Sequence, residues 1–190
     1  MSLRQNIKLL LGLLLVFCFQ VIANATQARD HLTPQEVDLV KDAQELDKRV
    51  EVFVKAADRR LLVISGGIDA ATAKQLKKDA ESWGELPTGS RAELVGDIAR
   101  ILDEAITNID DVSSRDERNP LIAKALRKLA TETTRIVTQL KPLSSQAKGE
   151  AEVASFEQLM ENADSIVAAA NKLPPPAVDK KKDKSKRTGG

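Results

Sequence analysis

Apolar residues recur at alternating steps of three and four along most of this chain, which is the spacing of one face of an α-helix. The pattern predicts long helices over residues 34–64, 91–112, 120–141 and 150–172, and a shorter helix over residues 70–83. No segment alternates apolar and polar residues as a half-buried strand does. The predicted fold class is therefore all-α.

Local signals mark where these helices begin and end. Thr33–Glu36 has the composition of a capping box with proline at the first helical position, and Asp69 is placed to cap the shorter helix. Asn119 precedes a proline and predicts another helix start. Gly66 predicts a helix end, and Pro142 predicts that the helix from residue 120 ends before it.

Each predicted helix has one apolar face and a charged outer face. Along the helix over 91–112, Asp97, Glu104 and Asp111 repeat every seven residues and are expected to point outward. The pattern favours an antiparallel helical bundle of four long helices plus one shorter helix. The alternative is an extended coiled-coil dimer through the first helix, whose apolar spacing is the most regular. That stripe consists of Leu39, Ala43, Leu46, Val50, Phe53, Ala57, Leu61 and Ile64.

The first 25 residues have the pattern of a signal peptide. A positively charged start over residues 1–8 precedes a short apolar core over residues 9–22, and Ala23 and Ala25 form a small-x-small cleavage pattern. The mature chain is expected to begin at Thr26. Because a membrane-spanning helix usually needs about 20 apolar residues, the short core favours cleavage over anchoring. The protein is predicted to be exported, periplasmic or secreted, with no transmembrane span after cleavage.

Cleavage at this site would remove Cys18, the only cysteine. The mature protein would then have no disulfide, although its compartment would permit one. Aromatic residues are scarce, so Ala, Leu, Ile and Val must form the core of the domain predicted over residues 26–173. A chain of this length can bury enough apolar surface to fold without such a crosslink.

Charge divides the mature chain into an acidic body and a basic tail. Residues 26–173 have a net charge of about −5, whereas residues 174–190 have about +4. The tail lacks apolar periodicity and is predicted to be disordered. Its charges are attracted to anionic envelope surfaces, but without an aromatic residue to stack on bases it predicts no specific nucleic-acid recognition. The basic residues are Lys180, Lys181, Lys182, Lys184, Lys186 and Arg187.

Catalytic and metal-binding patterns are missing from the sequence. His31 is the only histidine, it precedes the first helix, and we expect it to lie in a mobile segment without a function. One histidine and no mature cysteine give no support to a zinc, haem or nucleophilic site, so we predict no enzyme activity, no metal and no cofactor. Acidic pairs at residues 103–104 and 110–111 are interpreted as a solvated face. If the two helices are neighbours, these acids can pair with the basic line Lys124, Lys128 and Arg135.

The segments 32–37 and 42–53, read as LTPQEV and DAQELDKRVEVF, resemble the opening of an uncharacterised group of exported bacterial helical proteins. The resemblance covers about 25 residues and includes no catalytic motif. It implies export and helicity without implying an activity.

Two classes of function follow from these patterns. The first is an exported non-enzymatic helical protein that acts as an envelope interaction or assembly module, with a protein partner, an anionic surface or a second copy of the chain. The alternative is a helical bundle whose small-residue interior binds an apolar ligand or lipid. An enzyme based on paired acids such as Glu104 and Asp111 is the least favoured class.

Overall fold

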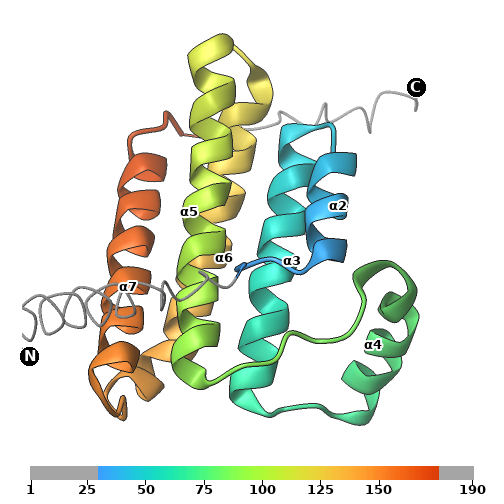
Figure 1. Ribbon diagram of the computed structural model, residues 1–190. Coiled ribbons are helices and arrows are strands. Elements are labelled where there is room, and N and C mark those ends of the chain that lie inside the picture. Colours follow the sequence, from blue (N-terminus) through green and yellow to red (C-terminus); the bar gives the residue numbers. More distant parts are fainter. Residues whose placement is uncertain (1–29, 176–190) are drawn as a thin grey trace, which may run out of the picture. The chain divides into compact units, whose positions relative to one another are not determined.

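A computed structural model describes residues 30–175 of the chain. Within that range the protein consists of helices joined by short connections and has no strand, which confirms the predicted all-α class (Figure 1). The helices are α2 (Pro34–Asp42), α3 (Leu46–Ser65), α4 (Ala70–Trp83), α5 (Arg91–Arg115), α6 (Pro120–Ser144) and α7 (Glu150–Asn171).

The single helix predicted over residues 34–64 is wrong, because the chain leaves the helical conformation at Ala43 and resumes it at Leu46. The break folds α2 back against α3. In one straight helix Glu36 and Arg60 would lie roughly 35 Å apart along the axis, whereas here Glu36 Oε1 accepts a hydrogen bond of 2.7 Å from Arg60 Nη1. Arg49 Nε donates to the Ala43 carbonyl at the break, over 3.1 Å.

Most of the predicted helix boundaries are confirmed. Thr33 and Glu36 form the reciprocal hydrogen bonds of a capping box, and Asp69 accepts from the Thr72 amide over 2.7 Å. Gly66 closes α3 in the left-handed conformation at φ 64°, which a side chain would disfavour. The caps therefore follow from local chemistry alone.

Two helix ends differ from the prediction. α5 continues to Arg115 instead of ending near residue 112. α6 continues through Pro142 to Ser144, although a proline removes one backbone hydrogen bond from a helix. In this last turn Ser145 Oγ and Gln146 Nε2 both donate to the Pro142 carbonyl, which caps the end of the helix.

The four longer helices α3, α5, α6 and α7 pack around a common core. α5 packs most extensively against α7 and α3, and α6 packs against α7 and α3. Between residues 30 and 175, α3 and α7 have no contact with each other. Going round the core, the order is therefore α3, α5, α7, α6, which differs from the order along the chain.

Neighbouring helices in this arrangement are not all antiparallel. Three ion pairs between α3 and α6 each join residues 77 positions apart, and a constant separation means that these helices run in the same direction. α5 and α7 are also parallel, because Arg91 contacts Glu152 and Asn162 contacts Ala99, at separations of 61 and 63. α3 and α5, which lie on either side of α4 in the chain, run in opposite directions, since Arg49 contacts Asn108 and Arg60 lies near Asp97.

The core is aliphatic, as the composition predicts. Its largest fully buried side chains include one phenylalanine, and α4 contributes only Trp83. The other large apolar members are Leu94, Ile98, Ile101, Leu102, Ile109, Leu129, Ile136, Leu140, Leu159 and Ile166. α4 thus lies beside α2, attached to the core through one end.

Two predicted regions lie outside residues 30–175. They are the signal peptide, with its cleavage residues Ala23, Ala25 and Thr26, and the basic residues between 180 and 187. None of the helices in the described range has the length and apolar character needed to span a bilayer.

Candidate functional site

A buried ionic cluster joins α2 to α3. Glu36 has no exposed surface and accepts hydrogen bonds from Arg59 Nε at 3.1 Å, from Arg60 Nη1 at 2.7 Å and from the Thr33 amide at 2.9 Å. Arg60 Nη2 lies 2.7 Å from Glu36 Oε2 and also 2.7 Å from the His31 carbonyl, to which it donates. The two guanidinium groups thereby fix the segment that leads into α2.

Arg59 extends this cluster to the connection between α4 and α5. Its Nη2 donates to the carbonyls of Trp83, Gly84 and Glu85 at 3.1, 3.2 and 2.5 Å. The Trp83 ring lies below two cations, 4.5 Å from Lys55 Nζ and 5.6 Å from the Arg59 guanidinium carbon. One arginine of α3 therefore holds α2 and the end of α4 together.

Asp97 belongs to the same buried region, and its predicted outward position is wrong. Its side chain is fully buried, and it accepts from Arg100 Nη2 at 2.6 Å. Arg60 Nε lies 4.0 Å from Asp97 Oδ2. Burial of a carboxylate is tolerated when cations compensate the lost hydration, and here two guanidinium groups do so.

His31 also has a partner, contrary to the prediction of a mobile residue. Its Nε2 lies 2.7 Å from Glu104 Oε2, and both side chains are partly exposed. Together with the hydrogen bond from Arg60 to the His31 carbonyl, this contact attaches the start of the described chain to α3 and α5. His31 therefore has a structural interaction.

A second set of ion pairs forms a row between α3 and α6, in which Asp47 is buried and the other two acids are partly exposed. The basic line on α6 pairs with acids of α3 and not with the acidic residues of α5, although α6 contacts both helices. The pairs are Asp47–Lys124 at 2.5 Å, Glu51–Lys128 at 2.7 Å and Asp58–Arg135 at 2.6 Å.

The pKa values of the carboxylates in this row are shifted in different directions. The hydrogen bond from Lys124 lowers the pKa of Asp47, and the hydrogen bond from Lys128 lowers the pKa of Glu51. Burial raises the pKa of Asp58, against the opposing effect of its partner Arg135. For the charged form of Asp58, the cost of losing hydration on burial therefore exceeds the stabilisation from the ion pair with Arg135.

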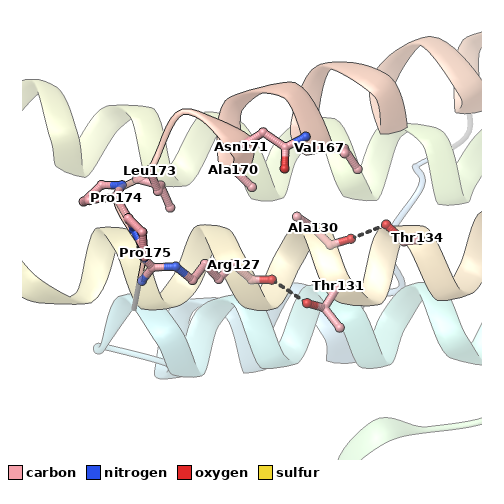
Figure 2. Close-up of a pocket in the computed structure, with 10 residues that line it drawn as sticks. All are labelled: Arg127, Ala130, Thr131, Thr134, Val167, Ala170, Asn171, Leu173, Pro174 and Pro175. Carbon is pink, nitrogen blue, oxygen red and sulfur yellow. Dashed lines mark hydrogen bonds between the residues drawn. The ribbon is translucent and has the colours of Figure 1, made fainter. Parts of the chain in front are cut away.

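A groove of about 420 Å³ lies between α6 and the C-terminal end of α7 (Figure 2). Ala130 of α6 with Val167 and Ala170 of α7 form its apolar walls, and the segment Leu173–Pro175 closes one end. Arg127 reaches this end and donates a hydrogen bond to the Pro174 carbonyl.

The polar groups in this groove are largely satisfied within the chain. The Thr131 hydroxyl donates to the Arg127 carbonyl at 2.9 Å, and the Thr134 hydroxyl donates to the Ala130 carbonyl at 2.8 Å (Figure 2). Arg127 is the single charged side chain in the lining. The groove therefore combines an apolar wall with one cation.

A second groove, of about 480 Å³, lies where α5 and α7 begin. One of its two cations is already neutralised, because Arg91 donates a hydrogen bond to Glu152. That bond lowers the pKa of Glu152 and raises the pKa of Arg91. Lys148 and Glu150 also line it, so this groove is polar and charged.

No group of three or more histidine, cysteine, aspartate or glutamate side chains gathers as a metal site between residues 30 and 175. The two acidic pairs of α5 have different surroundings in the structure. Glu104 of the first pair contacts His31, whereas Asp110 and Asp111 of the second pair are exposed. Glu36, Arg59, Arg60 and Asp97 were not identified as a cluster from the sequence. One signal was available for Arg60, which falls on the apolar stripe three residues after Ala57.

Comparisons with protein-family models, with curated proteins and with solved structures find no match for this chain. The resemblance of residues 32–37 and 42–53 to exported bacterial helical proteins therefore stays a prediction.

Proposed function

We propose that this chain is an exported, non-enzymatic helical protein, periplasmic or secreted, which acts through its surfaces as an envelope interaction or assembly module. The four longer helices serve as the bundle scaffold, and α2 and α4 are attached to its side. Export is supported by the signal-peptide pattern of residues 1–25.

The observation that carries the proposal is that the charged side chains serve to hold the fold together. Four of the buried ones, Glu36, Arg59, Arg60 and Asp97, hold helices and connections together. The row between α3 and α6 has the same architectural role. Such an arrangement favours a rigid scaffold whose contacts with other molecules are made by its outer faces.

The outer faces carry charge of both signs. Glu150, Glu157, Glu161 and Asp164 are exposed at helical spacing along α7, and no cation among residues 30–175 forms an ion pair with them. On α4, Lys74, Lys77 and Lys78 are exposed on one side. Charged faces of this kind guide association with oppositely charged partners and give it a dependence on salt.

The experiment is capture of partners by the tagged mature chain, residues 26–190, from an envelope extract, combined with N-terminal sequencing of the protein purified from its host. We expect a mature start at Thr26 and a partner that is retained at low salt and reduced in the variant Glu157→Lys with Glu161→Lys. The control Gln158→Lys adds charge beside the stripe without reversing it. A chain that keeps its signal, or that retains nothing at low salt, contradicts the proposal.

The alternative function, binding of an apolar ligand or lipid, is favoured by one observation, the groove between α6 and α7. The core of the described residues combines large aliphatic side chains with buried alanines, and protein interiors are close-packed by default. We therefore place such a ligand in the surface groove. Native mass spectrometry of protein purified from its own host tests this function, and a clean mass of the chain alone contradicts it.

A further inference from the structure

We propose that the groove between α6 and α7 binds a single-chain amphiphile with an anionic headgroup, a long-chain carboxylate, and that Arg127 holds the headgroup. The proposal rests on the alternative function above, and it adds the site, the residue and the charge of the ligand. The volume of about 420 Å³ falls within the range of small-molecule pockets.

The groove offers a chain of methylene groups an apolar surface. Ala130, Val167, Ala170 and Leu173 line it from two helices and the following segment (Figure 2). The two lining threonines direct their hydroxyls to carbonyls one turn earlier in α6. An apolar ligand therefore leaves neither threonine hydroxyl without a partner, and the polar cost of binding is confined to the Asn171 amide and Arg127.

The charge of the groove selects the headgroup. Among residues 30–175, no carboxylate lies within 4.0 Å of the Arg127 guanidinium. Its Nη2 donates to the Pro174 carbonyl, which holds the side chain at the end of the groove. A guanidinium has five N–H donors and binds a carboxylate through two parallel hydrogen bonds, so donors remain for a ligand.

The end of α7 does not oppose an anion strongly. The last carbonyls of a helix carry a partial negative charge, but here the Lys172 amide donates to the Ala169 carbonyl and the Leu173 amide to the Ala170 carbonyl, at 3.2 and 3.1 Å. The groove at the start of α5 and α7 is the internal contrast, because Glu152 already occupies its Arg91.

The occupant is a free amphiphile rather than a bilayer. A membrane-binding face exposes large apolar side chains together. The exposed large apolar residues in the described range are Ile68 and Val153, which lie on different segments, and neither lines this groove. The groove is shallow and open to solvent along α6 and α7, so it accommodates one acyl chain lying along its apolar wall.

The test is calorimetric titration of the full mature chain with monomeric dodecanoate and, in parallel, with dodecanol, which has the same chain length and no charge. We expect saturable binding of one dodecanoate per chain and weaker binding of dodecanol. Arg127→Gln should weaken dodecanoate binding about 10- to 100-fold, the loss of a charge-assisted contact, and leave dodecanol nearly unchanged. Arg118→Gln, at an exposed arginine outside the groove, is the matched control.

A second variant tests the apolar wall. Ala170→Leu should weaken both ligands by filling the groove, with an unchanged circular-dichroism melting curve showing that the fold is kept. Equal binding of both ligands with no effect of Arg127→Gln overturns the anionic headgroup but leaves the alternative function standing. Binding of neither ligand, or binding only to vesicles of anionic lipid, overturns the site as well.

Discussion

The buried cluster around Glu36 and the Glu51–Lys128 pair of the row between α3 and α6 use the same kind of ion pair in opposite surroundings. Glu36 and Arg60 are almost fully buried and form hydrogen bonds with one another and with backbone groups. In the row, Glu51 and Lys128 each keep more than a third of their side-chain surface in water. The geometries are similar, with N–O distances near 2.7 Å, but the cost of losing a partner differs greatly.

The comparison distinguishes ion pairs that the fold depends on from ion pairs that only assist the register of two helices. A buried charge without its partner keeps the whole desolvation penalty, so the cluster is sensitive to any single loss. An exposed charge without its partner is simply hydrated. The cluster therefore determines where α2 and the α4–α5 connection lie, whereas the row assists the register of two helices already held by apolar packing.

The largest effect is expected from Glu36→Ala, which leaves Arg59 and Arg60 buried without their carboxylate. We expect a loss of about 3–5 kcal/mol in the free energy of unfolding, measured by urea denaturation. Glu81→Ala, at an exposed position of α4, is the control and should be within about 0.5 kcal/mol of the parent. A Glu36 variant as stable as the control would show that the cluster is not energetically important.

A smaller effect is expected from Gly84→Ala, which disturbs the turn whose carbonyls accept hydrogen bonds from Arg59. Gly84 has φ +64°, and a Cβ there would lie 3.1 Å from the Gln35 side chain. We expect a loss of about 1–3 kcal/mol, with faster amide exchange in α4 than in α6. Gly67→Ala, which has no positive φ and only Ser65 Oγ at 3.9 Å, should be nearly neutral. Equal effects of the two substitutions would contradict this account.

The row is tested by a double-mutant cycle between Glu51→Gln and Lys128→Gln. The coupling energy should be about 0.2–1 kcal/mol and should shrink in 1 M salt, because exposed pairs are screened. A coupling above 3 kcal/mol that persists in salt would remove the distinction between the row and the cluster. Thermal denaturation at two salt concentrations provides the measurement.

The smallest effects concern pH within the row. The lowered pKa of Asp47 means that it stabilises the fold above its unfolded pKa of about 3.9, and that this contribution is lost as pH falls through the folded pKa. The raised pKa of Asp58 has the opposite sign, since its contribution is present below about pH 3.9 and is lost as pH rises through the folded pKa.

The corresponding measurement is the urea midpoint of Asp47→Asn and Asp58→Asn between pH 2 and 6. Asp47→Asn should flatten the loss of stability on the acid side, and Asp58→Asn should steepen it. The same direction of change in both variants would contradict the assigned pKa shifts.

Local signals were sufficient to predict much of the fold. The caps at Thr33, Asp69 and Asn119 depend on a few adjacent residues, and each lies where the sequence indicated. The break after Asp42 had no such signal, because Ala43, Gln44 and Glu45 are good helix formers. It is stabilised by contacts with Arg59 and Arg60, which lie far along the chain.

The sequence pattern could not predict which helices are neighbours, for a related reason. Each helix shows which of its faces is apolar, but not which other helix covers that face. Lys124 and Arg135 were correctly seen as one basic line, yet their partners are on α3 instead of α5. The groove of Arg127 arises in the same way, since α6 and α7 create it only together.

The parallel pairing of α3 with α6 has a kinetic consequence. Every ion pair between them closes a loop of 77 residues, so this contact forms late compared with the hairpin contacts of consecutive helices. A chain synthesised from its N-terminus can associate α3 with α5 while the surfaces that await α6 and α7 are still uncovered. During that interval the half-built core exposes aliphatic side chains, and the speed with which the last two helices arrive sets how long the chain is open to aggregation.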